Sequence, residues 1–136
     1  MQQYYTIGDV SRITQIPATT IRFYDKKGLL FFVNRSSNGV RIFTNKDLSL
    51  IFRIRYLRDI GVSVNEILEF MSLAVRGGEH SLKKQSEMLG EYQKALDERM
   101  KLLHSQMYYC SLMDSYLKEN KEFPILKFYK EMGFKL

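Results

Sequence analysis

The sequence predicts a mostly α-helical protein: a winged helix-turn-helix domain, then a long coiled-coil dimerisation helix, then a short helical tail. Three observations predict this fold class. Helix-starting residues recur through the first half, an Asn-Gly turn separates two short apolar segments there, and an apolar residue occupies every seventh position of the second half. The expected ranges are 1–77 for the first domain, 78–119 for the coil and 120–136 for the tail.

The first expected helix begins at Thr6. Thr6 and Asp9 have the spacing of a capping box, in which each side chain accepts a hydrogen bond from the other residue's backbone amide. After this start, Ile7, Val10 and Ile13 recur at helical spacing. We therefore expect these three residues to share one face of the helix.

A second short helix is expected to begin at Pro17, because proline fits the first helical position without losing a hydrogen bond. Gly28 should end it, since glycine adopts the left-handed conformation of a helix end without a Cβ clash. Between these residues, Ile21 is expected to face the core, whereas Thr19 and Arg22 lie on another side.

A β-hairpin is expected next, with strands over 31–34 and 40–43 and with Asn38-Gly39 near its tip. Asparagine and glycine tolerate the positive φ that tight hairpin turns need. Arg41 lies between two apolar residues of the second strand, so its side chain is expected to face away from theirs.

Two more starts of the capping-box type open the remaining helices of the first domain. Thr44-x-x-Asp47 precedes a helix expected over 45–60, and Ser63-x-x-Glu66 precedes the next one. Apolar residues at helical spacing in these two helices are the expected core. They are Leu48, Ile51, Phe52 and Leu57 in the first helix, and Val64, Ile67, Leu68 and Met71 in the second.

A single long helix is expected from Glu79 to about Glu119, because this stretch contains no proline. At ~1.5 Å per residue it would be about 60 Å long. Nothing else in the chain is large enough to cover its apolar stripe, whereas a second copy of the same helix would cover it by coiled-coil packing. The alternative is a helix that folds back on its own domain. The expected dimerisation residues are Leu82, Leu89, Leu96, Leu103, Cys110 and Leu117.

Pro124 is expected to start a last short helix, in which Ile125, Phe128, Tyr129 and Met132 are the apolar residues. Apolar residues at helical spacing most often pack against other apolar surface. The expectation is that this tail caps the dimer, and the alternative is that it lines a ligand pocket.

Basic charge is concentrated in the first domain. Residues 1–61 hold ten Lys/Arg and four Asp/Glu, whereas residues 62–136 hold eleven of each, so the whole net charge of +6 lies in the first segment. Uneven basic charge is typical of proteins that bind nucleic acid or anionic membranes. No apolar run reaches about 18 residues and no basic amphipathic helix has a wide apolar face. We therefore expect double-stranded DNA as the partner, and no membrane.

The second helix and the hairpin form the expected DNA-binding surface. The guanidinium of Arg22 can clamp a phosphate or a guanine edge, although an ion pair with Asp9 or Asp25 is the alternative. The hydroxyl of Tyr24 could donate to a phosphate, or its ring could belong to the core. The expected DNA-contact residues are Arg12, Ala18, Thr19, Thr20, Arg22, Phe23, Tyr24, Lys27, Arg35, Asn38, Arg41 and Arg58.

Taken together, these residues resemble the MerR family of bacterial transcription regulators. The resemblance rests on YTIGDVSRITQIPATTIRFYDKKGLL, NGVRIFTNKDL and IRYLRDIGVSVNEI, which together cover roughly residues 4–70. It implies a homodimer, joined by an antiparallel coil and bound to a pseudo-palindromic operator. It also implies that the protein bends and untwists DNA so that RNA polymerase can use an overlong promoter spacer. The chain is most similar to short members that lack a large sensor domain.

Several positions depart from the family pattern. Phe23 stands where a tyrosine is common, and it lacks the hydroxyl that would contact a phosphate. Phe31 and Phe32 replace prolines of the wing, and Val40 replaces a tyrosine. Tyr56 aligns with a reactive cysteine found in members that sense aldehyde and thiol stress, so this kind of sensing is not expected.

Other functions find little support in the sequence. It offers no nucleophile–base pair or carboxylate constellation, so we do not expect an enzyme. Cys110 is the single cysteine, and neither His80 nor His104 has a cysteine at metal-ligand spacing, so we expect no metal and no cofactor. The cysteine usage and the lack of a signal-peptide pattern favour the cytoplasm. Two alternatives stay open: an architectural or adaptor DNA-binding protein, and a small-molecule effector of unknown identity.

Overall fold

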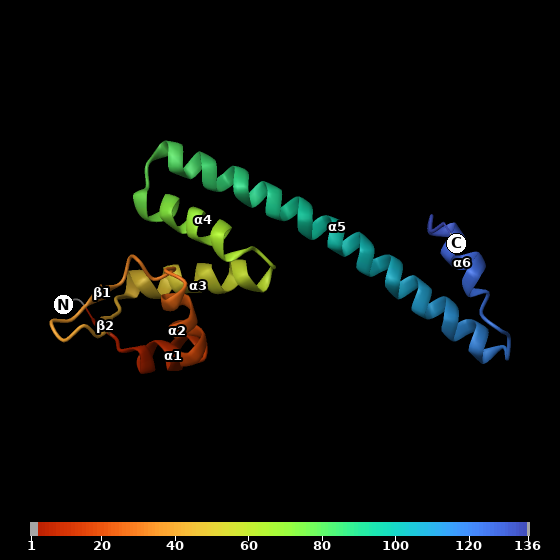
Figure 1. Cartoon of the computed structure of the whole chain (residues 1–136), viewed down its shortest axis with the longest axis horizontal. Helices are drawn as coiled ribbons and strands as arrows, with labels where there is room; N and C mark the ends of the chain where they lie inside the picture. The colour runs from red at the N-terminus through yellow and green to blue at the C-terminus, as the bar shows by residue number, and fades with distance from the viewer. Residues whose placement is uncertain (1–2, 136) are drawn as a thin grey trace. The chain divides into compact units, whose positions relative to one another are not determined.

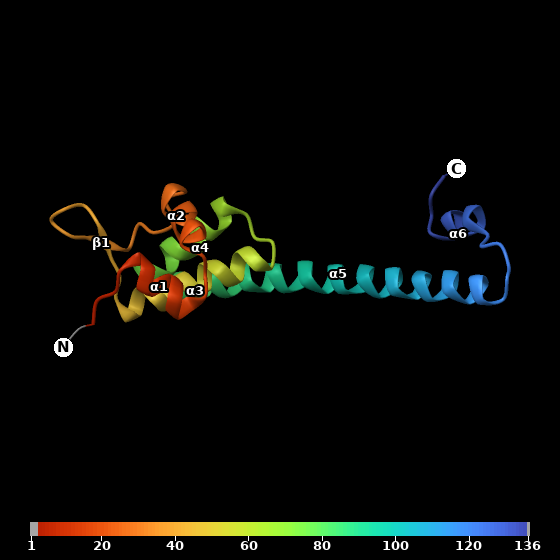
Figure 2. The ribbon, with the colours of Figure 1, turned by 90° about the horizontal axis from the view of Figure 1, so that it is seen from below.

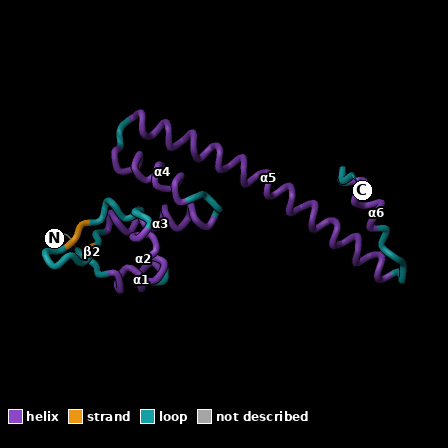
Figure 3. Tube along the Cα trace, in the orientation of Figure 1, coloured by secondary structure: helices purple, strands orange, loops and turns teal. Residues whose placement is uncertain are grey.

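The computed structural model describes residues 3–135 and is built almost entirely of helices, as Figures 1 and 3 show. The chain divides into two compact units, Met1–Gln93 and Lys94–Leu136. The outermost ends of the predicted ranges, residues 1–2 and 136, lie outside the described residues. The elements in chain order are α1 (Ile7–Thr14), α2 (Ala18–Lys26), β1 (Asn34–Arg35), β2 (Arg41–Ile42), α3 (Asn45–Asp59), α4 (Val64–Arg76), α5 (Glu79–Lys118) and α6 (Ile125–Glu131).

Capping boxes define the starts of three helices in the first unit. At α1, the Asp9 amide donates to Thr6 Oγ1 at 3.2 Å, and the Thr6 amide donates to Asp9 Oδ2 at 3.0 Å. The same arrangement opens α3 at Thr44 and α4 at Ser63. Each box satisfies amides that the helix itself leaves unpaired. The three helix starts predicted from the sequence are therefore confirmed.

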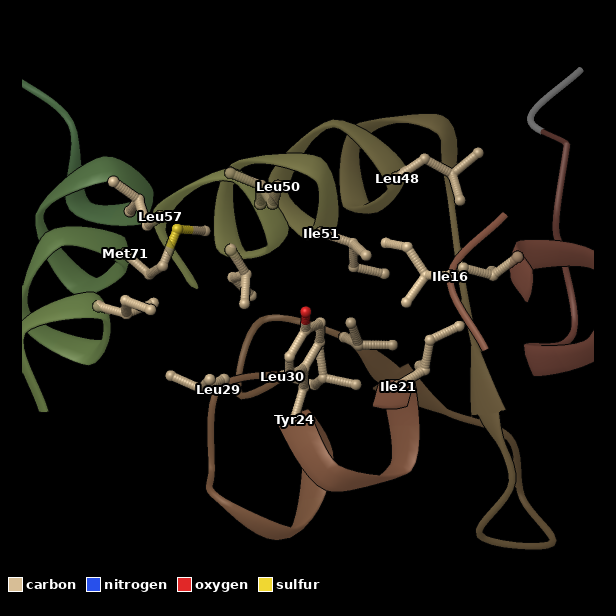
Figure 4. Close-up of a cluster of buried hydrophobic side chains, with 14 of the residues drawn as sticks. Ile16, Ile21, Tyr24, Leu29, Leu30, Leu48, Leu50, Ile51, Leu57 and Met71 are labelled. Atoms are coloured by element: carbon tan, nitrogen blue, oxygen red, sulfur yellow. The ribbon is translucent and has the colours of Figure 1, made fainter. Parts of the chain in front are cut away.

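The core of the first unit lies between α2, α3 and α4 (Figure 4). Ile21 and Tyr24 of α2 point toward Ile51 of α3, and none of the three side chains is more than 2% exposed. Leu57 of α3 and Met71 of α4 extend the same cluster. Burying one such side chain stabilises the fold by about 1.5–3 kcal/mol. This packing fixes α2 on α3 and leaves the opposite face of α2 toward solvent.

Two apolar residues of the first unit are exposed, and one of them, Phe52, was predicted to lie in the core. Ile13 is 45% exposed, because the buried side of α1 passes through Val10 and Thr14 instead. The Thr14 hydroxyl donates to the Val10 carbonyl at 2.7 Å, which satisfies this buried polar group. Phe52 of α3 is 48% exposed and belongs to a surface hollow that is described below. The prediction that Phe52 lies in the core is therefore wrong.

The wing is a shorter hairpin than the sequence predicts. Asn34 pairs with Ile42 and Arg35 pairs with Arg41 in an antiparallel register. Each strand has two residues, so the four-residue strands expected from the sequence are wrong in extent. The predicted turn is confirmed, because Gly39 has a φ of 77° that an L side chain rarely adopts.

The first turns of α5 belong to the first unit. A Gly77-Gly78 connection with φ values of 69° and 88° leads from α4 into α5. Ser81 and Gln85 of α5 are buried, and Tyr92 packs against the apolar core. As a result the compact unit extends past residue 77, where the sequence placed the end of the domain, although α5 begins where expected.

The second unit consists of the remaining part of α5 together with α6, and an aromatic cluster joins these two segments. The ring centroids of Tyr109 and Phe128 lie 3.7 Å apart. Phe123 lies 5.3 Å from Phe128 and 5.5 Å from Tyr116. Figure 2 shows α6 beside the end of α5. The last helix begins after Pro124, as the sequence predicts.

Candidate nucleic-acid interface

Helix α2 begins with short side chains and an open first turn. Pro17 precedes the helix, and no side chain hydrogen-bonds to its first amides. Thr19 is exposed, while Ala18 and Thr20 are partly buried. Gly28, with a φ of 76°, follows the other end of the helix as predicted. Small residues at this start allow another molecule to approach the helix backbone closely.

Arg22 is exposed on α2 and has no ion-pair partner among residues 3–135. The two acids that could have paired with it are engaged elsewhere. Asp9 accepts from Arg12 at 2.9 Å, and Asp25 accepts from Arg41 at 2.5 Å. The guanidinium of Arg22 therefore keeps its planar set of donors for an external anion.

The two aromatic residues that follow Arg22 take different positions. Phe23 is 38% exposed, and the Lys27 ammonium lies 5.7 Å from its ring centroid, which is within cation–π range. Tyr24 is 2% exposed and its hydroxyl points toward α3 (Figure 4). Burial raises the pKa of Tyr24, and nearby Arg55 partly opposes this rise. The structure thus shows the core-ring alternative for Tyr24, and its predicted phosphate contact needs correction.

The wing arginines are engaged within the chain. Arg41 donates to the Val33 carbonyl at 2.7 Å and to Asp25, and its side chain is 20% exposed. The guanidinium of Arg41 is therefore turned toward Asp25 of α2, a contact that the alternation along β2 does not predict. Arg35 donates to the Gly39 carbonyl at 2.7 Å and remains 52% exposed.

Arg12 and Arg58 are exposed, and each makes a surface contact within the chain. Arg12 forms the i,i+3 pair with Asp9, and the Arg12 side chain is 76% exposed. This pair and the hydrogen bonds from Thr6 lower the pKa of Asp9, with the backbone hydrogen bond as the largest cause. Arg58 donates to the Val62 carbonyl at 3.5 Å. Asn38 lies exposed near the wing tip.

Asp25 is a residue that the sequence analysis missed as part of the site. It was considered only as an alternative partner of Arg22. Its true partner, Arg41, lies sixteen positions along the chain. No periodicity or motif spacing relates a helix residue to a strand residue at that distance, so the sequence contains no signal for this pair.

Most residues of the predicted dimerisation stripe of α5 are exposed, and Leu96 is partly buried. Leu82 is 65% exposed, Leu103 is 55% exposed and Leu117 is 72% exposed. Cys110 is exposed and forms no disulfide. Within α5, the buried residues are Ser81 and Gln85. A row of large apolar side chains exposed to water is typical of a surface that binds another molecule.

A hollow of about 640 Å³ lies in the first unit between α3 and the beginning of α5. Phe52 and Tyr56 line it from α3, and Leu82 and Leu89 line it from α5. Arg53 adds a cationic group to its lining. The hollow is continuous with the apolar stripe, since it contains the first two leucines of that stripe.

Within residues 3–135, no group of three or more His, Cys, Asp or Glu side chains is arranged to hold a metal ion. In the same range, no helix has the length and apolar character that crossing a membrane requires.

The sequence was then compared with known proteins. The profile of the MerR HTH family regulatory proteins matches residues 5–73, just over half of the chain. The chain belongs to the MerR family.

Two HTH-type transcriptional regulators match more of the chain. The HTH-type transcriptional regulator ZntR of Escherichia coli K12 is 27% identical over 101 residues, which cover 74% of this chain and 72% of that protein. The HTH-type transcriptional regulator CueR of Salmonella typhi is 33% identical over 95 residues, which cover 68% of this chain and 69% of that protein.

A solved structure shows the same architecture. HiNmlR, a MerR family regulator that lacks the sensor domain and was crystallised with promoter DNA, superposes with a TM-score of 0.71. It is 26% identical and covers 86% of this chain and 92% of that one. These findings make the chain a MerR family transcriptional regulator with a helix-turn-helix domain.

Proposed function

We propose that this MerR family protein is a homodimer that recognises a pseudo-palindromic promoter operator and regulates transcription there. The observation that carries the proposal is the exposed guanidinium of Arg22 on α2, which has no ion-pair partner among residues 3–135. Such an arginine can bind an anion without first breaking an ion pair within the protein. The promoter DNA in the HiNmlR crystal supports the same assignment.

On the DNA side, we assign direct contacts to the exposed residues of α2 and the wing. Arg22 would contact a phosphate or guanine, and Thr19 would approach base edges with its small side chain. Arg35 and Asn38 of the wing would contact the backbone or the minor groove. Phe23 packs beneath Lys27, which with Arg12 and Arg58 supplies general attraction. The remaining proposed contacts are Ala18 and Thr20.

On the protein side, we propose that two copies pair through α5. The exposed stripe from Leu82 to Leu117 supports this pairing, since each copy would remove the other's leucines from water. In an antiparallel arrangement centred near Arg99, Leu82 of one copy would lie opposite Leu117 of the other. The two Cys110 side chains would then lie far apart.

The regulatory steps are proposed from family membership. The dimer would bend and untwist the operator so that RNA polymerase can use the promoter, and it would act in the cytoplasm, where promoter DNA lies. A small-molecule effector would add control over this step. The enzyme hypothesis has no support from the relatives, which are transcriptional regulators.

The test is titration of the purified chain against its own upstream DNA and against random duplex at several salt concentrations. Preference for one palindrome supports a sequence-specific regulator. Equal affinity for both duplexes, with a steep dependence on salt, would replace the proposal with an architectural DNA-binding protein. Lack of binding to either duplex would refute both functions.

A further inference from the structure

One carboxylate of α2 holds both strands of the wing. Asp25 Oδ1 accepts a hydrogen bond from Arg41 Nη2 at 2.5 Å, and Arg41 Nη1 donates to the Val33 carbonyl at 2.7 Å. Arg35 approaches the other oxygen, with 3.7 Å between its Nη2 and Asp25 Oδ2, and its Nη1 donates to the Gly39 carbonyl at 2.7 Å. We call Asp25 and Arg41 the wing clamp.

The wing needs such a clamp because its backbone pairing is minimal. Each strand has two residues, and a short two-stranded hairpin has little stability of its own in water. The Asp25 and Arg41 side chains are 28% and 20% exposed, so water screens their attraction less than it screens a surface pair. Two nitrogens of the rigid Arg41 guanidinium donate to two different acceptors, which fixes the orientation of the guanidinium as well as its distance from Asp25.

We infer that Asp25 and Arg41 are positioning residues for DNA binding, which hold the wing at a fixed place relative to α2. The inference rests on the proposed DNA-binding function. With the clamp closed, α2 and the wing meet the duplex as one surface. Arg41 then makes no phosphate contact of its own. Arg35, which is more exposed and more loosely paired, is the wing arginine that is available to a phosphate.

Electrostatics and positioning predict opposite signs for one substitution. Asp25 carries a negative charge within a surface that is proposed to bind a polyanion. If only charge mattered, Asp25→Asn would strengthen DNA binding. If the clamp positions the wing, the same substitution weakens binding, because the wing must be ordered again when DNA binds.

Asp59→Asn is the matched control. Asp59 pairs with Arg55 on α3 at 3.1 Å and is 59% exposed, and its substitution changes the net charge by the same amount. We expect Asp25→Asn to bind the operator about tenfold more weakly than the wild type. Asp59→Asn should bind as tightly as the wild type or tighter. Equal affinities of the two variants would overturn the inference.

Substitutions of Arg41 separate positioning from phosphate contact. Arg41→Lys keeps the charge but cannot hold both acceptors, so operator affinity should fall. Arg41→Gln should weaken binding and leave the slope of log affinity against log salt unchanged. A slope that becomes shallower by about 0.9 would identify a lost phosphate contact and overturn the inference. The double variant with Asp25→Asn should lose no more than Arg41→Gln alone.

Amide hydrogen exchange of residues 33–42 in the free protein tests the clamp without DNA. Asp25→Asn should speed exchange in the wing and leave α3 protected, whereas Asp59→Asn should not affect the wing. Unchanged wing protection in Asp25→Asn would show that no clamp exists. A wild-type chain that binds no DNA would instead refute the proposed function, and the exchange result would still decide whether Asp25 orders the wing.

Discussion

Leu103 allows a quantitative test of the dimer proposed along α5. Its side chain is 55% exposed in the single chain. Complete burial of a leucine contributes about 1.5–3 kcal/mol, so covering this exposed half contributes roughly 1 kcal/mol in each copy. A substitution occurs twice in a homodimer, and Leu103→Ala should therefore cost about 2 kcal/mol of dimer stability. With 1.4 kcal/mol for each factor of ten, the dimer should dissociate about 30-fold more readily.

Sedimentation equilibrium over a range of protein concentrations measures this dissociation constant. Lys101→Ala is the control, because two residues along a helix turn the side chain to the opposite face and alanine preserves helix propensity. Circular dichroism checks that both variants keep their helix content. Equal dissociation constants for the wild type and both variants would refute the packing argument. Leu96→Asp should disrupt the dimer more strongly, because it buries a charge in the dimerisation stripe of α5. A fully intact dimer of this variant would contradict pairing through the stripe.

Three further outcomes are expected. Arg22→Ala should weaken operator binding by about 1–3 kcal/mol with the melting temperature unchanged. Lys83→Ala, which removes the same charge outside α2 and the wing, is the control. Equal operator affinities of the two variants would contradict the assignment of Arg22 as a DNA contact. Ser63→Ala removes the capping box of α4 and should lower the free energy of unfolding in urea by about 1 kcal/mol. Burial and then nearby glutamates raise the pKa of Tyr92 above 10.0, so its contribution to stability is present below pH 10 and is lost as pH rises further. In Tyr92→Phe, the free energy of unfolding should fall less steeply as pH rises above 10. Equal slopes of this free energy against pH in the wild type and the variant would contradict the role of Tyr92.

The parts of the fold that depend on neighbouring residues were predictable from the sequence. A capping box such as Thr6 with Asp9 needs residues three positions apart, so the helix starts follow directly from the letters. The end of α2 at Gly28 and the turn at Gly39 follow from the backbone freedom of single residues. The length of α5 follows from the absence of proline between Glu79 and Lys118.

The parts that depend on distant residues were not predictable. Alternation along β2 predicted that Arg41 faces away from Val40 and Ile42, but it carried no information that the guanidinium donates to Asp25 of α2. Phe52 has the spacing of a core residue, yet the hollow beside α5 leaves it exposed. For Tyr24, the sequence favoured a phosphate contact over a core position, and its packing in the core shows the second of these.

Because the proposed dimer forms through the exposed leucine stripe of α5, its formation should depend on temperature. Association that removes apolar surface from water has a negative heat-capacity change, and its driving force weakens on cooling. If the stripe closes the dimer, a dilute solution of the protein should contain more single chains in the cold than near 25 °C. Operator occupancy would then fall on cooling even when the affinity of the assembled dimer for DNA is unchanged.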